Sequence, residues 1–128
     1  LVGSEMCIRD SYEDDDFKVI LDASPATKGH ALILPKQHYA NIFEIEDETL
    51  AKAAKLAKKI MTHEKDVLGC EGYNLVQNNG EVAGQTVFHF HMHLVPRYIK
   101  DNVTMTWIPG KADTEELSTL SKALRKRI

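Results

Sequence analysis

Three of the six histidines in this chain stand at every second position of one short stretch, at His89, His91 and His93. Because successive side chains of a β-strand point to opposite faces of a sheet, a strand would place all three imidazoles on one face, about 7 Å apart. The residues around them are apolar and would form the other face: Phe88, Phe90, Met92 and Leu94. A helix would rotate each ring by about 200° from the next and would form no shared site. The alternation therefore predicts a strand from about residue 86 to residue 97.

This row of histidines is a candidate site, and its spacing leaves two kinds of chemistry open. Imidazoles two residues apart on a strand can share a zinc ion, because imidazole nitrogen is a common zinc ligand. Alternatively, one imidazole can act as the nucleophile of a phosphoryl or acyl transfer while the others orient it or donate protons. The spacing does not separate these two interpretations. A purely structural role is the weakest of the three.

The length and composition of the chain limit the classes of protein to which it can belong. Its 128 residues suffice for one domain with its own core, and 43% hydrophobic with 27% charged residues is ordinary for a globular protein. The net charge of −3 argues against binding to a nucleic-acid backbone, whereas a small nucleotide needs only local donors. No apolar run is long enough to span a bilayer, so we expect no membrane partner.

The N-terminal region and the cysteines favour a cytoplasmic location. Cys7 and Cys70 form neither a Cys-x-x-Cys pair nor a disulfide framework, and an acidic run over residues 13–16 stands where a signal peptide would be apolar. Residues 1–11 begin with Leu1 and fit poorly with the pattern of the remaining chain. We therefore expect residues 1–11 to be a non-native or disordered segment, and residues 12–128 to form a single domain.

Hydrophobic periodicity predicts four short strands and two helices along the chain. Period-two or continuous apolar runs predict strands over residues 17–23, 30–35, 73–78 and 86–97, and apolar spacing of three and four predicts helices over residues 46–68 and 114–128. The second helix carries Leu117, Leu120 and Leu124 on one side. The first two strands are close enough to pair antiparallel, and helices set apart from the strands indicate an α+β fold with an antiparallel sheet.

Two further groups of residues would reach the histidine face. Asp22 at the end of one strand and His30 at the start of the next would share an edge of the sheet. The loop over residues 78–84 is rich in glycine and would deliver Gln85 and Thr86 to the entrance of the histidine face, with backbone N–H groups free to approach a phosphate. A plain hairpin connection explains the same loop.

The sequence QTVFHFHMHLVPR over residues 85–97 resembles the signature of the histidine triad (HIT) family, in which three histidines alternate with apolar residues. The resemblance extends to LDASPATKGHALILPKQH over residues 21–38, which is similar to the first hairpin of the family, and to residues 78–80 and 84–85, which are similar to its loop before the triad. It covers about residues 12–100 and is nearest to small bacterial members.

The resemblance implies a fold, an assembly and a reaction. It implies a five-stranded antiparallel sheet with flanking helices, and a homodimer in which two protomers form one continuous sheet. It implies hydrolysis or transfer at the α-phosphorus of a nucleoside phosphate, with a purine nucleotide as substrate, through a covalent nucleotidyl-histidine. It requires no metal cofactor if protein donors stabilise the charge on the phosphoryl oxygens.

The match to the family motif also implies roles for individual residues. His91 would be the nucleophile, His93 would hydrogen-bond the phosphate or the attacking ring, and His89 would support it from behind. His30 would complete the histidine cluster. The remaining residues implied by the resemblance bind the nucleotide: Gln85 and Thr86 at phosphate oxygens or the leaving group, Asp22 at the ribose hydroxyls, Asn78 and Gly84 near the phosphate, and Leu21, Ala23 and Leu32 around the base.

One departure from the family concerns zinc. Many bacterial relatives carry a Cys-x-x-Cys near the N-terminus that binds zinc together with two histidines, whereas this chain has Cys7 followed by Ile8, Arg9 and Asp10. His38 and His89 are present, but a tetrahedral site would lack a ligand. We therefore expect no structural zinc.

The sequence leaves the leaving group undefined. A purine nucleoside phosphoramidase is the leading interpretation, and a dinucleoside polyphosphate hydrolase is the second enzyme compatible with the same motif. A nucleotide-binding regulatory module with little turnover is a third interpretation, which the intact His91 disfavours. A metalloprotein that uses the three-histidine face remains the fourth.

Overall fold

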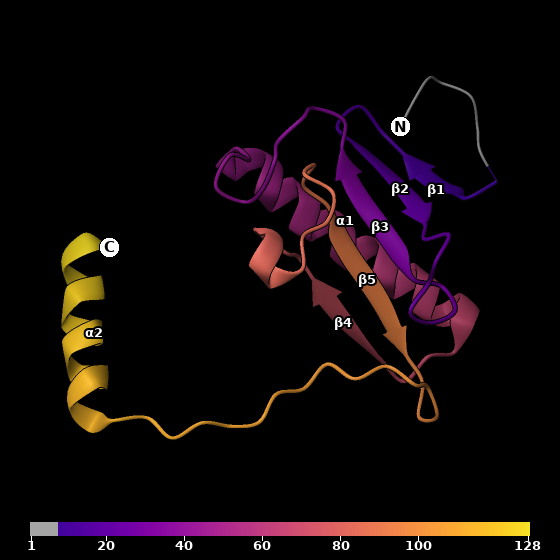
Figure 1. Cartoon of the computed structure of the whole chain (residues 1–128). Helices are drawn as coiled ribbons and strands as arrows, with labels where there is room; N and C mark the ends of the chain where they lie inside the picture. The colour runs from indigo at the N-terminus through magenta and orange to yellow at the C-terminus, as the bar shows by residue number, and fades with distance from the viewer. Residues whose placement is uncertain (1–7) are drawn as a thin grey trace.

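The computed structural model describes residues 8–128, drawn in colour in Figure 1. Its elements, in chain order, are β1 (Asp10–Glu13), β2 (Phe17–Leu21), β3 (Ala31–Pro35), α1 (Asp47–Leu68), β4 (Gly72–Val76), the short 3-10 helix η1 (Glu81–Ala83), β5 (Met92–Arg97) and α2 (Thr114–Arg127). Residues 1–7 of the segment set apart in the sequence, Cys7 included, lie outside the described residues.

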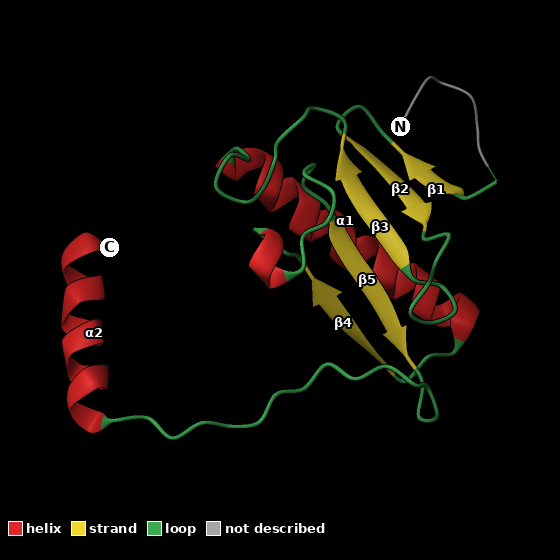
Figure 2. Cartoon of the chain, viewed as in Figure 1, coloured by secondary structure: helices red, strands yellow, loops and turns green. Residues whose placement is uncertain are grey.

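The strands form one five-stranded sheet in the order β1-β2-β3-β5-β4, and every neighbouring pair is antiparallel (Figure 2). This confirms the expected α+β fold with five antiparallel strands and two helices. The order places β5 between β3 and β4, so the strand that ends the histidine motif lies inside the sheet. Strands β1 and β4 are its edges.

The hydrophobic core lies between the sheet and α1, which runs across one face of the sheet (Figure 1). Ala53 and Ala57 on α1 are completely buried, and side chains this small let the helix backbone approach the strands closely. The strand residues beneath the helix are apolar and alternate with residues of the other face: Phe17, Val19, Ala31, Ile33, Met92 and Leu94. The helix ends as the sequence predicts, with Gly69 at φ 65°.

Strand β1 is the element that the sequence analysis missed. The strand is only four residues long and its residues are polar. Two of them, Asp10 and Ser11, fall inside the segment expected to be non-native or disordered. The Asp10 carboxylate lies 3.3 Å from the ammonium of Lys18 in a nearly buried ion pair, and Asp10 pairs with Ile20 on β2. Asp10 and Ser11 therefore belong to the sheet, although they precede residue 12, where the single domain was expected to begin.

The predicted histidine strand was too long at its start. Strand β5 begins at Met92, so His93 lies in the strand while His89 and His91 lie in the extended segment before it. The β3–β5 ladder ends at the pair Ile33–Met92. Beyond it, the carbonyl of Pro35 accepts a hydrogen bond from the His89 ring instead of from a strand N–H. The alternation itself holds, except at Phe88, which is exposed.

The two helices are placed differently. Helix α1 covers the sheet, whereas α2 lies apart at the end of an extended segment (Figures 1 and 2). Helix α2 has no buried residue. Over residues 8–128, neither helix combines the length and the apolar character needed to cross a membrane.

Gly29 offers a test of the turn that positions His30. Its φ of +90° lies in the left-handed region, and an added Cβ would meet the side chains of Leu68 and Glu64 on α1. We expect Gly29→Ala to lower the free energy of unfolding by about 1–3 kcal/mol in urea titrations. Gly110→Ala is the matched control, because nothing lies within 4 Å of its added Cβ. Equal stability of the two variants would contradict this account.

Candidate functional site

The histidines of the motif lie on the face of the sheet away from α1. The ladder places His93 opposite Leu32 on β3 and Val76 on β4, and Leu32 opposite Ile20 on β2. These four side chains form a row across the sheet, because paired residues in neighbouring strands point to the same face. The row is apolar except for the imidazole of His93. A flat apolar ligand could therefore lie against the row, next to that imidazole.

The pairing of β3 with β5 brings His30 into direct contact with His93. The Nε2 atom of His30 lies 3.0 Å from Nδ1 of His93. The backbone N–H of Ala26 donates to Nδ1 of His30 over 3.0 Å, so that nitrogen carries no proton. The proton of the neutral His30 ring must then sit on Nε2 and be donated to His93, which leaves the proton of His93 on its own Nε2.

His91 is oriented by its own backbone. Its Nδ1 lies 2.7 Å from the carbonyl oxygen of His89 and donates to it, because a carbonyl can only accept. In the neutral ring, Nε2 of His91 is therefore unprotonated and available to attack an electrophile. The rings of His91 and His93 meet edge to face with centroids 4.9 Å apart, so the ring with an unprotonated Nε2 is in contact with the ring that carries an Nε2–H.

Electrostatics keep the inner pair of rings neutral. Burial lowers the pKa of His93 to about 4, and the neighbouring rings of His91 and His30 act in the same direction. Burial also lowers the pKa of His30, while the carboxylate of Asp22 opposes the shift. That carboxylate lies 3.6 Å from Nε2 of His30. Neutral rings can keep the hydrogen bond from Nε2 of His30 to Nδ1 of His93, whereas two charged rings would face each other with two N–H groups and repel each other.

A second pair of histidines lies behind the first. Nε2 of His89 donates to the carbonyl of Pro35 over 2.9 Å, so Nδ1 of His89 accepts from Nδ1 of the exposed His38 at 2.9 Å. The two nitrogens that face each other are thus joined by a hydrogen bond. Two imidazoles supply half of the four ligands that a structural zinc site needs, and the described residues do not complete such a site.

A metal is also a chemical alternative at the first pair, because Asp22, His30 and His93 each offer one ligand atom within 4.8 Å of the others. The direct contact of 3.0 Å between the two ring nitrogens has the length of a hydrogen bond. Ligands of one tetrahedral zinc ion would lie farther apart, at roughly 3.4 Å for nitrogens about 2.1 Å from the metal. The geometry therefore favours a proton between the rings.

The loop before the histidines is organised by Gln85, whose side chain is almost completely buried. Its amide donates to the carbonyls of Ala40 and Val87 over 2.6 and 3.2 Å, and its oxygen accepts from the N–H of Gly80 over 2.8 Å. Both amide hydrogens are therefore used within the loop. The family motif implies that Gln85 binds phosphate oxygens or the leaving group; in this structure its side chain holds the loop.

The other expected residues lie around the same loop and turn. Asn78 lies beside Gly84, where an added Cβ would come within 3.6 Å of its amide nitrogen. Thr86 is exposed and comes directly after Gln85. Asp22 caps a turn by accepting from the N–H of Ser24, and Ala23 between them is exposed.

One expected residue is on the wrong face. Leu21 lines a hollow of about 440 Å³ between the sheet and the end of α1, so it cannot form a wall beside His93. Its neighbour Ile20 occupies that place, because Ile20 is paired with Leu32 and Leu32 with His93. A shift of one residue changes the face. Only the pairing of the strands shows that Leu32, opposite His93, is also opposite Ile20 rather than Leu21. The sequence alone does not give this pairing.

Comparison with known proteins identifies the family. The model of the HIT domain matches residues 9–100. This chain belongs to the HIT family. The match covers the whole sheet, from β1 to β5, as well as the histidine motif.

Relatives and solved structures agree with the HIT assignment. The protein named "Protein hit" of Bacillus subtilis is 40% identical over 120 residues, which are 91% of this HIT chain and 83% of the relative. The adenosine 5'-monophosphoramidase hnt1 of Schizosaccharomyces pombe is 36% identical over 109 residues, 84% of this chain and 79% of the relative. A crystal structure of a HIT family protein from Bacillus anthracis superposes with a TM-score of 0.88 at 36% identity, covering 96% of this chain and 89% of the other.

The depressed pKa of His93 predicts acid sensitivity. The folded protein disfavours the charged ring, so below the ordinary pKa of 6.5 the unfolded chain binds more protons and stability is lost as the pH falls toward about 4. We expect the urea midpoint to fall between pH 6.5 and 4.5, and to fall less in His93→Asn, whose side-chain oxygen still accepts from His30. His63→Asn, at an exposed position, is the control. A decline in His93→Asn as steep as in the wild type would rule out this origin.

The hydrogen bond of Thr27 offers a test of the turn that positions His30. Its hydroxyl, buried, donates to the carbonyl of Pro96 over 2.6 Å and ties the turn to the end of β5. Thr27→Val leaves that carbonyl unpaired, and we expect a loss of about 1–3 kcal/mol in urea unfolding, whereas Thr27→Ser keeps most of the stability. The ¹⁵N shifts of the His30 ring should show a mixed tautomer only in Thr27→Val. An unchanged Thr27→Val would refute this role.

Proposed function

We propose that this HIT protein hydrolyses nucleotides at the α-phosphorus, with a purine nucleoside phosphoramidate as the leading substrate class. The observation that carries the proposal is the hydrogen bond from Nδ1 of His91 to the carbonyl of His89, which leaves Nε2 of the neutral ring unprotonated. Membership in the HIT family, and a relative that is named an adenosine 5'-monophosphoramidase, support a hydrolase of nucleotides.

In the first step, Nε2 of His91 attacks the α-phosphorus. A phosphorus–nitrogen bond forms to the ring, the bond from phosphorus to the leaving group breaks, and the leaving group departs with the electron pair and takes up a proton. The ring of His93 packs against that of His91, and its Nε2–H would donate to a phosphoryl oxygen as charge grows there. The carbonyl of His89 accepts from the ring as it gains positive charge.

In the second step, water attacks the phosphorus of the nucleotidyl-histidine. The phosphorus–nitrogen bond breaks, the imidazole leaves with the electron pair, and the proton of the attacking water is released. The product is the nucleoside monophosphate, and His91 returns with its Nε2 unprotonated. The two-step route is faster because Nε2 of His91 displaces a leaving group that water would displace only slowly, and water then attacks the more reactive nucleotidyl-histidine.

The row across the sheet suits the base, and the turn after β2 suits the sugar. Leu32 offers apolar surface beside His93, with the largely buried Ile20 on the far side of Leu32, and the carboxylate of Asp22 can accept from ribose hydroxyls. Thr86, Asn78 and the backbone at Gly84 remain the candidates for phosphate and leaving-group contacts. Ala23, exposed next to Asp22, is a candidate at the rim of the base site.

Dinucleoside polyphosphates are the alternative substrates, because they present the same α-phosphorus with a different leaving group. A regulatory nucleotide-binding module would have no need of an oriented His91 nitrogen, which favours turnover. We further infer that the reaction proceeds without a metal cofactor, that the protein is a homodimer whose two sheets join, and that it acts in the cytoplasm. The free, buried thiol of Cys70 is consistent with a reducing compartment.

The deciding experiment measures AMP release from an adenosine phosphoramidate by the wild type and by His91→Ala, with and without a chelator. We expect chelator-resistant release by the wild type and a loss of at least about a thousandfold in His91→Ala, because its nucleophile is gone. His63→Ala is the matched control, since His63 is exposed on α1. An alkaline quench during turnover should trap AMP on the peptide that contains His91.

The outcomes separate the alternatives. Equal rates in the wild type and His91→Ala would refute the nucleophile. Release that the chelator abolishes would refute the metal-independent reaction. Hydrolysis of diadenosine polyphosphates without hydrolysis of the phosphoramidate would identify dinucleoside polyphosphates as the substrate class. Nucleotide binding without turnover of either substrate would identify the protein as a binding module.

A further inference from the structure

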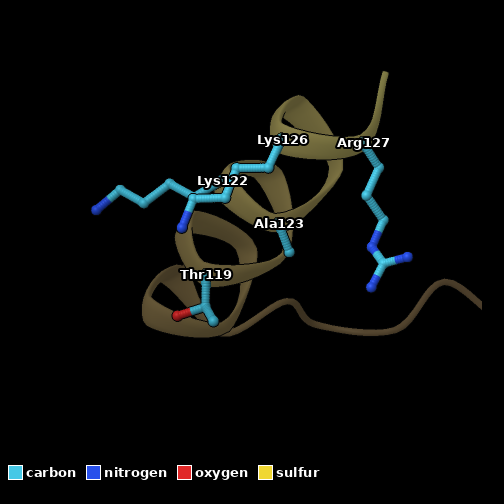
Figure 3. A pocket seen from close by; sticks show the side chains of 5 residues that line it. All are labelled: Thr119, Lys122, Ala123, Lys126 and Arg127. Carbon is cyan, nitrogen blue, oxygen red and sulfur yellow. The ribbon is translucent and has the colours of Figure 1, made fainter.

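Arg97 closes the histidine motif, yet the proposed reaction gives it no role. A cation at the end of the strand that carries His93 would ordinarily be a candidate phosphate ligand. The cations of α2 project from the helix surface, as Figure 3 shows for Lys122, Lys126 and Arg127. The guanidinium of Arg97 instead donates through all three of its nitrogens to groups of the same fold. The role of Arg97 must therefore lie in what it holds.

The main partner of Arg97 is Asp101, in the loop that follows β5. Nε and Nη2 of Arg97 donate to the two carboxylate oxygens of Asp101 over 2.8 and 2.9 Å. The same carboxylate accepts from the backbone N–H of Tyr98 over 2.9 Å and from that of Val103 over 3.2 Å. The hydrogen bonds from Arg97 hold the pKa of Asp101 well below its ordinary value, so the carboxylate stays charged and keeps these donors. The backbone of Tyr98 is thereby fixed at the end of β5.

Tyr98 reaches from this loop to the turn between β2 and β3. Its hydroxyl donates to the carbonyl of Lys28 over 2.7 Å, and in the other direction the buried hydroxyl of Thr27 donates to the carbonyl of Pro96 over 2.6 Å. We call these two hydrogen bonds the clamp. They join two segments that lie at the same end of the sheet (Figure 1) and that border a hollow of about 440 Å³. On this side, the turn therefore owes its position to the clamp.

The turn held by the clamp contains the backbone group that places the proton of His30. The N–H of Ala26 donates to Nδ1 of His30 over 3.0 Å, so the proton of this ring sits on Nε2 and is donated to Nδ1 of His93. If Ala26 moves away, Nδ1 of His30 can take the proton instead, and Nε2 of His30 then accepts from Nδ1–H of His93. That exchange would leave Nε2 of His93 without the proton that the reaction needs at a phosphoryl oxygen. The position of one turn thus decides which nitrogen of His93 carries a proton.

We propose that Tyr98 is a positioning residue of the reaction, held in place by the ion pair of Arg97 with Asp101. Through the clamp, Tyr98 keeps the N–H of Ala26 against the histidine pair, which leaves a proton on Nε2 of His93. Arg97 acts at a distance from the reacting atoms and makes no contact with phosphate. The inference rests on the proposed function, in which the proton of His93 is donated to a phosphoryl oxygen, and it gives the end of the histidine motif a role in that reaction.

The test compares the full chain with its variant Tyr98→Phe, which removes only the hydroxyl. The ¹⁵N shifts of the histidine rings are recorded at about pH 8, where ordinary histidines are neutral. We expect the shifts of the two ring nitrogens to approach each other in both His30 and His93 of Tyr98→Phe, because each ring becomes a mixture of tautomers. In AMP release, kcat should fall by at least about twofold with KM nearly unchanged, because only molecules with a proton on Nε2 of His93 react.

Two further variants sharpen the comparison. Tyr12→Phe is the matched control, because it removes a tyrosine hydroxyl of β1 that donates to Asp14 over 2.9 Å; it should keep the tautomers and the kcat of the wild type. Arg97→Lys keeps a cation that could bind phosphate but loses the fork that holds Asp101, so we expect it to behave as Tyr98→Phe does.

Three results would overturn this role of Tyr98. Unmixed tautomers in Tyr98→Phe would show that the clamp does not set the proton. Mixed tautomers with the kcat of the wild type would show that the proton on Nε2 of His93 does not matter to the reaction. A raised KM in Arg97→Lys with unmixed tautomers would make Arg97 a phosphate ligand. Absence of AMP release from the wild type would count against the proposed function instead, while the spectra would still decide the role of the clamp.

Discussion

The antiparallel pairing of β3 with β5 carries the site. It sets Leu32 opposite His93 and, at the end of β3, brings His30 within hydrogen-bond distance of a ring 63 positions away in the sequence. Without this register, the rings of His30 and His93 would not be joined by a hydrogen bond, and Leu32 would not lie next to His93. The chain between β3 and β5 contains α1, which packs on one face of the sheet, and β4, which pairs with β5. Both elements therefore stabilise the position of β5 next to β3.

The two faces of the sheet meet different demands. One face is closed by α1 with apolar side chains, which fixes the strands relative to one another. The other face keeps a polar group in a partly buried row, and such a group must be hydrogen-bonded to avoid a large cost. Within residues 8–128, no buried side-chain nitrogen or oxygen lacks a hydrogen-bond partner. Buried Thr27, His30 and Gln85 are each satisfied, which makes the surroundings of the site rigid before a ligand arrives.

Backbone groups, rather than other side chains, assign the proton positions of the histidines. The N–H of Ala26 and the carbonyls of Pro35 and His89 each fix one ring nitrogen, and these bonds in turn set the direction of the side-chain contacts. Backbone groups are placed by the fold and do not titrate, so the tautomers are set independently of pH as long as the rings stay neutral. This explains how a site built almost entirely from imidazoles can present an unprotonated nitrogen and an N–H donor on two rings that are in contact.

The sequence by itself determined four of the five strands, the two helices and the chemical character of the histidine face, because alternation and helical spacing are local properties of the chain. It also placed His30, Asp22 and the loop near that face through the motif. Only the tertiary structure decided the register, which put Ile20 in the place expected for Leu21. It alone showed that Gln85 is consumed by the loop, and that polar β1 joins the sheet. The apolar side of α2 was visible in the sequence, but where it packs was not, since periodicity specifies that a face must be covered and not which surface covers it.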